Sequence, residues 1–216
     1  MTERSRARLI PGDDPGTPGV AADVLARGGL IVFPTDTVYG VAAAVDHPEA
    51  VARLYHVKGR PLDRPIPVLV SDLDQVPRLT GEVDPLVLDL LQRFWPGALT
   101  VAVPAAPWLP REIVRDTGRV GLRMPDHPLA LAIIAAAGGA LATTSANRSG
   151  EPETRTAAEA DAALGDRVDL IIDGGPAPGG VPSTVLVVDG RRLTVTRRGA
   201  LDPEEIVRAF PEFTLS

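Results

Sequence analysis

Short apolar runs alternate with polar segments rich in Gly and Pro along the whole chain. Residues 18–27 have a helical pattern that ends at Gly28, and an Ala-, Leu- and Ile-rich run after Pro128 stops at Gly138. Runs of four or five residues dominated by apolar and β-branched side chains predict strands at 30–33, 41–45, 66–70, 99–103, 120–123, 140–143, 168–172, 184–188 and 193–197.

Capping residues and prolines mark where further helices start. Thr156 and Glu159 have the spacing of a capping box, in which each side chain accepts a hydrogen bond from the backbone N–H of the other residue. Proline is favoured at the first position of a helix, directly after the capping residue. Three more helices are therefore predicted to start at His47–Pro48, Asp84–Pro85 and Asp202–Pro203, and the helix after Pro128 to start at His127–Pro128.

The order of these elements predicts the architecture. Roughly seven or more strands interleaved with helices indicate an α/β domain of three layers around a mixed sheet of about seven strands. Several strands are apolar on both faces, as expected when helices cover both sides of a sheet, and the turn at Asp189–Gly190 adds an antiparallel hairpin. We expect a single domain over residues 18–216. For residues 1–17, an N-terminal tail, two alternatives stay open: disorder, or a cap over the ligand site.

Composition excludes several kinds of site. The 216 residues include no Cys and three His, so disulfides and cysteine nucleophiles are absent, and no two His have the HExxH spacing of a zinc site. The apolar run from Leu129 to Ala142 is shorter than the roughly 18–20 residues of a membrane span. We therefore expect a soluble, cytoplasmic protein without a membrane partner. The net charge of −6 argues against a general nucleic-acid coat but not against a local basic cleft.

Lys58 is the only lysine among 22 basic residues. Lysine presents a compact point charge and arginine a planar fork, so a single retained lysine suggests a site that arginine does not fill. Arg60 and Arg64 follow it closely, in a segment that Gly and Pro keep out of a helix. Three close cations repel one another unless an anion lies among them, so the segment suits phosphate binding. The alternative is a solvated basic loop.

Further polar segments lie at the ends of predicted strands. Residues 34–40 carry two threonine hydroxyls, a carboxylate and a phenol, and residues 143–150 carry small hydroxyl and amide groups. Residues 179–184 are Gly-rich, and the arginines Arg123 and Arg197 end strands of their own. Ligands of open α/β sheets collect at strand ends, so we expect these segments to border one cleft. No P-loop, GxGxxG or GxSxG motif occurs, so a nucleotide would bind by other means.

Taken together, these segments resemble the YrdC-like family, whose enzymes are threonylcarbamoyl-AMP synthases. The resemblance extends from about Gly29 to Leu201 and is to the single-domain form, since longer members continue into a second domain. It implies a twisted mixed sheet with a large, concave, electropositive cleft. The matching motifs are, in order, PTDTVYG, KGRP, FWPGALT, VGLRMPDHPLAL, TTSANRSG, GGVPSTV and the RRG end.

The resemblance also implies a reaction, in which L-threonine, bicarbonate and ATP give L-threonylcarbamoyl-AMP and pyrophosphate. The product would serve tRNA modification, with tRNA and threonylcarbamoyl-transferase proteins as downstream partners. Mg²⁺ is expected on the phosphates with few protein ligands, and Asp36 is considered as an outer-sphere contact. By the resemblance, ATP contacts Lys58, Arg60, Ser145, Asn147 and Arg197, with Lys58 and Arg60 as catalytic residues, and L-threonine contacts Thr37, Arg123, Thr143 and Ser183.

Two positions depart from the family pattern. Some members have Asn where this chain has Arg64 and His where it has Leu69, so the resemblance assigns neither residue a role. Two other functions therefore stay open. A related carbamoyl-adenylate enzyme would use a different acceptor, and carbamoyl phosphate in place of threonine would reveal it. A non-catalytic RNA-binding module would bind RNA with a steep salt dependence and release no pyrophosphate.

Overall fold

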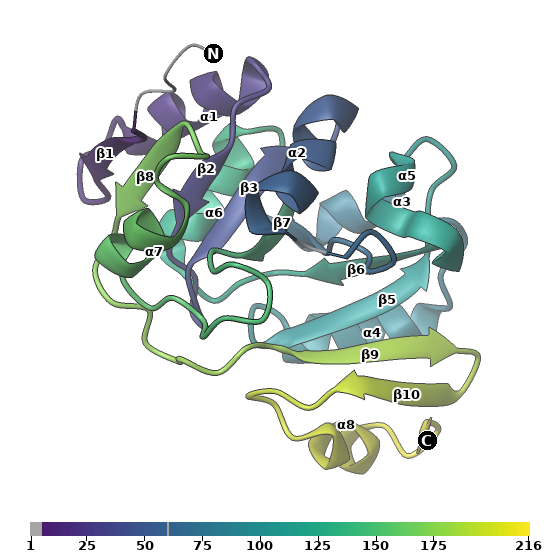
Figure 1. The fold of residues 1–216 in the computed structure, drawn as a ribbon. Coiled ribbons are helices and arrows are strands. Elements are labelled where there is room, and N and C mark those ends of the chain that lie inside the picture. Colours follow the sequence, from purple (N-terminus) through teal and green to yellow (C-terminus); the bar gives the residue numbers. More distant parts are fainter. Residues whose placement is uncertain (1–5, 60) are drawn as a thin grey trace.

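Within residues 6–59 and 61–216, which the computed structural model describes, the strands form one mixed sheet of eleven strands. Their order is β1-β8-β2-β3-β7-β4-β6-β5-β9-β10-β11, and the sheet twists from β1 towards β10 (Figure 1). The strands are β1 (Arg8–Pro11), β2 (Ile31–Phe33), β3 (Gly40–Ala44), β4 (Val68–Val70), β5 (Leu99–Pro104), β6 (Arg119–Arg123), β7 (Ala140–Ser145), β8 (Leu170–Asp173), β9 (Thr184–Asp189), β10 (Arg192–Arg197) and β11 (Thr214–Leu215).

The helices connect these strands and pack on both faces of the sheet. None of them, in the described part of the chain, is long and apolar enough to cross a membrane. They are α1 (Thr17–Ala26), α2 (Pro48–Lys58), α3 (Val76–Leu79), α4 (Pro85–Phe94), α5 (Arg111–Val114), α6 (Pro128–Ala136), α7 (Ala157–Leu164) and α8 (Pro203–Ala209), with 3₁₀ turns at Leu73–Gln75 and Arg115–Thr117.

The expected mixed α/β arrangement is confirmed, but the expected number of about seven strands is wrong. Every predicted run overlaps a strand, and two edge strands add to them. β1 pairs in parallel with β8 and has one buried residue, Ile10, so it carries no periodic signal. β11 is two residues long and pairs in parallel with β10. Residues 8–11, assigned to the N-terminal tail from the sequence, thus belong to the sheet.

The cross-strand register assigns residues to the two faces of the sheet, because directly paired residues point to the same side. On one face, Ala142 pairs with Ala43 and Val68, and Leu122 pairs with Val68 and Val101. These residues belong to a hydrophobic core that α2, α4 and α7 complete. We call this the covered face.

The opposite face is covered only in part. Over β2, β3 and β8, the helices α1 and α6 close a second core that extends to Leu69 and Leu141. At β5 and β9, by contrast, Ala102, Val185 and Val187 of this face are half-buried. We call this region the open face; polar side chains on it can reach a ligand.

Candidate active site

A cavity of about 230 Å³ lies against the open face. Leu69, Thr100, Arg123 and Thr143 line it from four neighbouring strands. The register explains their meeting: Leu69 pairs with both Arg123 and Leu141, and Leu141 and Thr143 are two residues apart on β7. Thr100 lies opposite Arg123 by continuation of the β5–β6 ladder. The sheet itself therefore fixes the floor of the cavity.

Loops from distant parts of the sequence complete the lining. Of the residues assigned from the resemblance, Arg60 lies outside the described residues. Arg64 and Leu69, which had no assigned role, also line the cavity. Every other assigned residue lines it as well: Thr37, Lys58, Arg123, Thr143, Ser145, Asn147, Ser183 and Arg197. The structure thus brings these segments together around one cavity.

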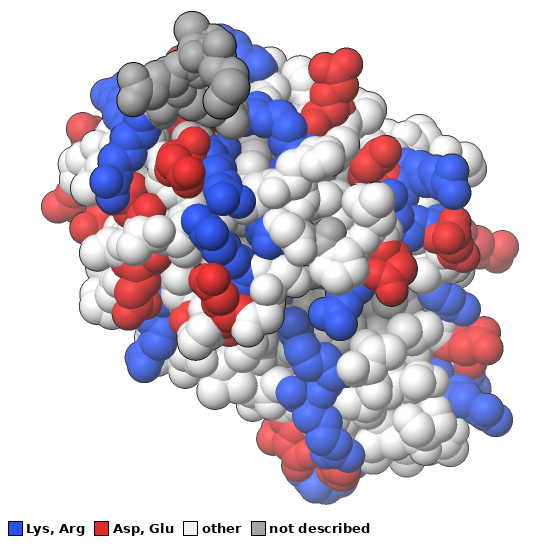
Figure 2. All heavy atoms as spheres, in the orientation of Figure 1, with Lys and Arg blue, Asp and Glu red and all other residues white. Residues whose placement is uncertain are grey.

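Positive charge is concentrated locally despite the acidic balance of the chain. Figure 2 shows a band of Lys and Arg side chains across one face, continuing over the region of β9, β10 and α8. The cavity lining contains four cations, Lys58, Arg64, Arg123 and Arg197, and Glu153 is the one acidic residue among its described lining residues. Lys58 and Arg123 are buried, and this local surplus of positive charge favours an anionic ligand.

Lys58 joins the basic segment to the Ser-Ala-Asn loop. It is the last residue of α2, and Gly59 takes the left-handed conformation, with φ of +61°, that ends the helix. The buried ammonium donates hydrogen bonds to the backbone oxygens of Ser145 and Asn147 and to Asn147 Oδ1, at 3.0 Å for the last. In return, Ser149 N donates to the Lys58 carbonyl at 2.9 Å. The lysine thus fixes the loop after β7 beside its own charge.

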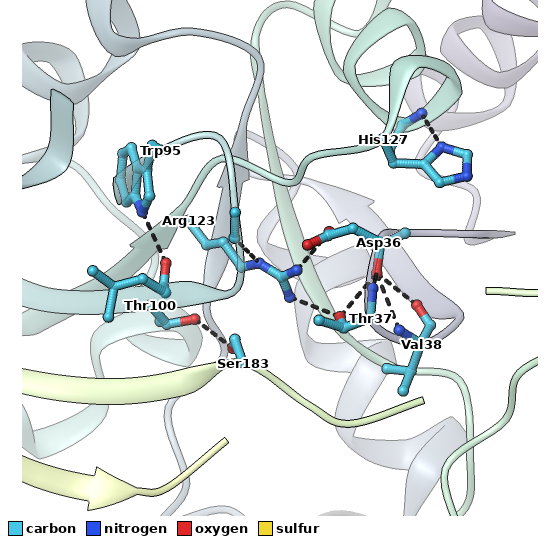
Figure 3. A network of polar contacts seen from close by, with 12 residues as sticks. Asp36, Thr37, Val38, Trp95, Thr100, Arg123, His127 and Ser183 are labelled. Carbon is cyan, nitrogen blue, oxygen red and sulfur yellow. Dashed lines mark hydrogen bonds and ion pairs between the residues drawn. The ribbon is translucent and has the colours of Figure 1, made fainter. Parts of the chain in front are cut away.

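Arg123 occupies the other side of the cavity and is nearly buried. Its Nε donates to Gly97 O at 2.9 Å, Nη1 to Thr37 Oγ1 at 2.9 Å and Nη2 to Asp36 Oδ1 at 2.5 Å (Figure 3). Burial lowers the pKa of this guanidinium, and the neighbouring carboxylate of Asp36 opposes the shift. The ion pair therefore keeps a buried cation charged and in place.

The hydroxyl of Thr37 has a defined direction. Thr35 Oγ1 donates its proton to Val38 O at 2.7 Å, so at the 3.1 Å contact between the two threonine hydroxyls Thr37 is the donor. Thr37 Oγ1 in turn accepts from Arg123. The proton of the Thr37 hydroxyl is thus used within the protein, and one lone pair of Thr37 Oγ1 remains. Towards the cavity Thr37 therefore offers a hydrogen-bond acceptor for an amino group.

A second polar chain runs through Ser183. Arg197 donates from Nε to Ser183 O at 2.9 Å and from Nη2 to Ser183 Oγ at 3.0 Å, which ties the end of β10 to the start of β9. Thr100 Oγ1 lies 2.8 Å from Ser183 Oγ (Figure 3). Burial lowers the pKa of Arg197, and Glu153 opposes this shift.

Sequence reasoning missed two polar lining residues, Thr100 and Glu153. Thr100 is fully buried on an apolar strand, and a lone hydroxyl among apolar neighbours was the available signal. Glu153 gave none, since acidic residues are common in loops. Its Oε2 is buried and has no hydrogen-bond partner among the described residues, which indicates that a ligand group belongs beside it.

Asp36, considered from the sequence as an outer-sphere Mg²⁺ contact, instead pairs with Arg123. Across residues 6–59 and 61–216, no group of three or more His, Cys, Asp or Glu could hold a metal ion. A donor set of one carboxylate, Glu153, fits a metal that arrives on a nucleotide rather than one held by a protein cage.

The fold and the cavity define an α/β protein with a cation-lined cavity on the open face of a mixed sheet. The family model Sua5_yciO_yrdC, described as "Telomere recombination", matches residues 23–199. The chain belongs to this Sua5/YciO/YrdC family.

Known relatives agree with this membership. A threonylcarbamoyl-AMP synthase of Bacillus subtilis (strain 168) is 41% identical over 187 residues, which cover 86% of this chain and 54% of that protein. A putative threonylcarbamoyl-AMP synthase of Mycobacterium tuberculosis (strain ATCC 25618 / H37Rv) is 38% identical over 186 residues, covering 86% of this chain and 85% of that protein.

The fold matches solved structures as well. The crystal structure of P. abyssi Sua5 complexed with L-threonine has a TM-score of 0.91 and 32% sequence identity, covering 98% of this chain and 63% of that one. This chain thus spans a little over half the length of the B. subtilis relative it matches, at 54%.

Proposed function

We propose that this chain is an L-threonylcarbamoyladenylate synthase, a nucleotidyltransferase that makes L-threonylcarbamoyl-AMP and pyrophosphate from L-threonine, bicarbonate and ATP. The observation that carries the proposal is that Lys58 and Arg123 line one cavity, with the hydroxyls of Thr37, Thr143 and Ser183 around it. The names of the B. subtilis and M. tuberculosis relatives and the L-threonine in the P. abyssi structure support it.

The nucleotide side of the site is formed by Lys58, Ser145, Asn147 and Arg197. The ammonium of Lys58 lies among oxygens of the Ser-Ala-Asn loop, so a phosphate there meets a fixed positive charge. Phosphoryl-type transfer depends mainly on positioning and charge neutralisation, so this donor set suits it without a catalytic His or Cys. Mg²⁺ would enter as a companion of ATP and add neutralising charge at the phosphates. Arg60 is proposed as a further ATP contact and catalytic residue.

The amino-acid side is formed by Arg123, Thr37, Thr143 and Ser183. Arg123 would grip the α-carboxylate of threonine, and the acceptor lone pair of Thr37 would receive the amino group. The neutral amine attacks the carbon of bicarbonate, water leaves, and a carbamate forms. A carbamate oxygen then attacks the α-phosphorus of ATP, and the bond to pyrophosphate breaks. Both reactants are held in one cavity, which makes the attack effectively unimolecular.

The product would pass to threonylcarbamoyl-transferase proteins that modify tRNA. A mixed anhydride of a carbamate and a phosphate is labile in water, so direct transfer to such a partner protects it. We extend the proposal to these partners and to tRNA on this chemical ground.

The decisive assay incubates the purified chain with Mg·ATP, L-threonine and labelled bicarbonate and follows pyrophosphate. We expect release only when threonine and bicarbonate are both present. Turnover that is independent of threonine contradicts the proposal. Turnover with carbamoyl phosphate in place of threonine would identify a related enzyme with another acceptor. Tight, salt-sensitive RNA binding without pyrophosphate release would identify an RNA-binding module.

A further inference from the structure

Asp36 is a carboxylate at the edge of a site dominated by positive charge. Its Oδ1 lies 2.5 Å from Arg123 Nη2, and the two side chains are 13% and 7% exposed. In Figure 3 the side chain of Asp36 points to the guanidinium, while its neighbour Thr37 contacts the other terminal nitrogen. Adjacent residues of one loop therefore hold the two terminal nitrogens of Arg123.

The donors of Arg123 can be counted. Arginine has five N–H groups in one plane. Nε donates to Gly97 O, one N–H of Nη1 to Thr37 and one N–H of Nη2 to Asp36. These contacts leave two N–H groups for a ligand, one on each terminal nitrogen. Two N–H groups on different nitrogens are what a carboxylate needs to bind through both oxygens.

We propose that Asp36 is a positioning residue, which sets the plane of the Arg123 guanidinium so that its two remaining N–H groups grip the α-carboxylate of the amino-acid substrate. The inference rests on the proposed function, because it takes an amino acid as the ligand of Arg123. It also replaces the Mg²⁺ contact considered from the sequence, since a carboxylate already paired with a guanidinium is a weak metal ligand.

Two effects of Asp36 on a bound carboxylate oppose each other. Its negative charge repels the ligand, whereas its hydrogen bond holds the receptor in the geometry that the ligand needs. Without the contact to Asp36, the buried Arg123 keeps only its hydrogen bonds to Gly97 O and Thr37 Oγ1. The guanidinium can then turn within the cavity. Bidentate pairs are sensitive to such misplacement. The geometric effect therefore dominates, and Asp36 strengthens binding.

The test compares Asp36→Asn with wild type by calorimetric titration of L-threonine and of L-threonine amide, which lacks the carboxylate. The matched control is Asp169→Asn, because Asp169 forms a half-buried ion pair with Arg53 at 3.0 Å outside the cavity lining. KM for ATP is measured in parallel. If Asp36→Asn does not fold, Asp36→Glu is used in its place, since it keeps the charge and lengthens the side chain by one methylene.

We expect Asp36→Asn to weaken L-threonine binding by about tenfold or more, on the scale of one charge-assisted contact. Binding of L-threonine amide and KM for ATP should each change by less than about twofold. The ratio of the affinity for L-threonine to the affinity for the amide therefore falls. Asp36→Glu should weaken L-threonine binding, and Asp169→Asn should not. Unchanged or tighter L-threonine binding in Asp36→Asn, or an equal loss for the amide, overturns the inference. If wild type itself does not bind L-threonine, the proposed function fails instead.

Discussion

At the scale of single residues, Lys58 shows why one lysine stands among arginines. Lys58 is 4% exposed, and its ammonium lies among the backbone oxygens of Ser145 and Asn147 and the side chain of Asn147. A compact ammonium can donate in three directions, which suits a cage of oxygens from one loop, whereas a planar guanidinium is too wide for it. The sequence composition predicted a lysine-specific position, and this cage is its physical reason.

Lys58→Arg and Lys58→Met should both lower the rate of pyrophosphate release by about 100-fold or more, the scale for one lost transition-state contact. The methionine variant also leaves buried carbonyl oxygens without a donor, so its free energy of unfolding should fall by about 1–3 kcal/mol. Steady-state kinetics and urea unfolding measure the two effects. Near-wild-type turnover in Lys58→Arg would show that the cage does not select lysine.

The site could be predicted from the sequence where polar residues follow apolar strands. Thr37, Arg123 and Ser145 stand at such boundaries, Ser183 directly precedes β9, and the cavity brings all four together. Thr100 was missed because a β-branched residue in a strand ordinarily packs against its neighbours. Only its contact with Ser183, just before β9, reveals its polar role.

At the scale of elements, helix starts were predictable because a cap depends on a few adjacent residues. The Thr156–Glu159 capping box forms as expected, and three of the predicted proline starts also have capping side chains. His47 precedes its helix but makes no side-chain cap, so that expectation is wrong. The capping bonds that form are accepted by Asp84 from Leu86 N, by His127 from Ala130 N and by Asp202 from Glu204 N.

His127 should make stability depend on pH through its cap on α6. Burial lowers its pKa below the ordinary value of 6.5, against the opposing charges of Asp36 and Asp126. Below about pH 6.5 the unfolded chain therefore takes up a proton that the folded chain refuses, so stability falls as pH falls. His127→Asn keeps a capping acceptor and removes the titration.

Thermal unfolding of both proteins between about pH 5 and 8 measures this effect, over the range in which histidine titrates. We expect similar stability near pH 8 and a steeper loss for wild type on the acid side. Parallel curves for wild type and His127→Asn would contradict the role of His127.

Gly199, which follows β10, should tolerate no side chain. A Cβ there would lie 2.3 Å from Pro182 O and from the carbonyl carbon of Ser183. Gly199→Ala must therefore displace Ser183, with a loss of about 1–3 kcal/mol in stability and a higher KM for L-threonine. Gly19→Ala in α1 is the matched control, because nothing lies within 4 Å of its Cβ. Equal stability and KM in the two variants would refute the displacement.

At the scale of the whole molecule, strand order was out of reach of the sequence. The central neighbours β3, β7, β4 and β6 come from segments far apart in the chain, and their pairing depends on contacts that no local pattern encodes. The order nevertheless decides function. It places Leu69, Thr100, Arg123 and Thr143 on one face, at and beyond the edge of the core that α1 and α6 cover, and so creates the cavity floor.

The central claim is that one cavity holds a nucleotide and an amino acid together. The most direct measurement is a crystal structure of the chain with Mg²⁺, a non-hydrolysable ATP analogue and L-threonine. The account predicts the phosphates beside the positive charge of Lys58 and the threonine carboxylate on Arg123, with both ligands in the same cavity. Ligands in separate sites, or a threonine that leaves Arg123 untouched, would contradict it.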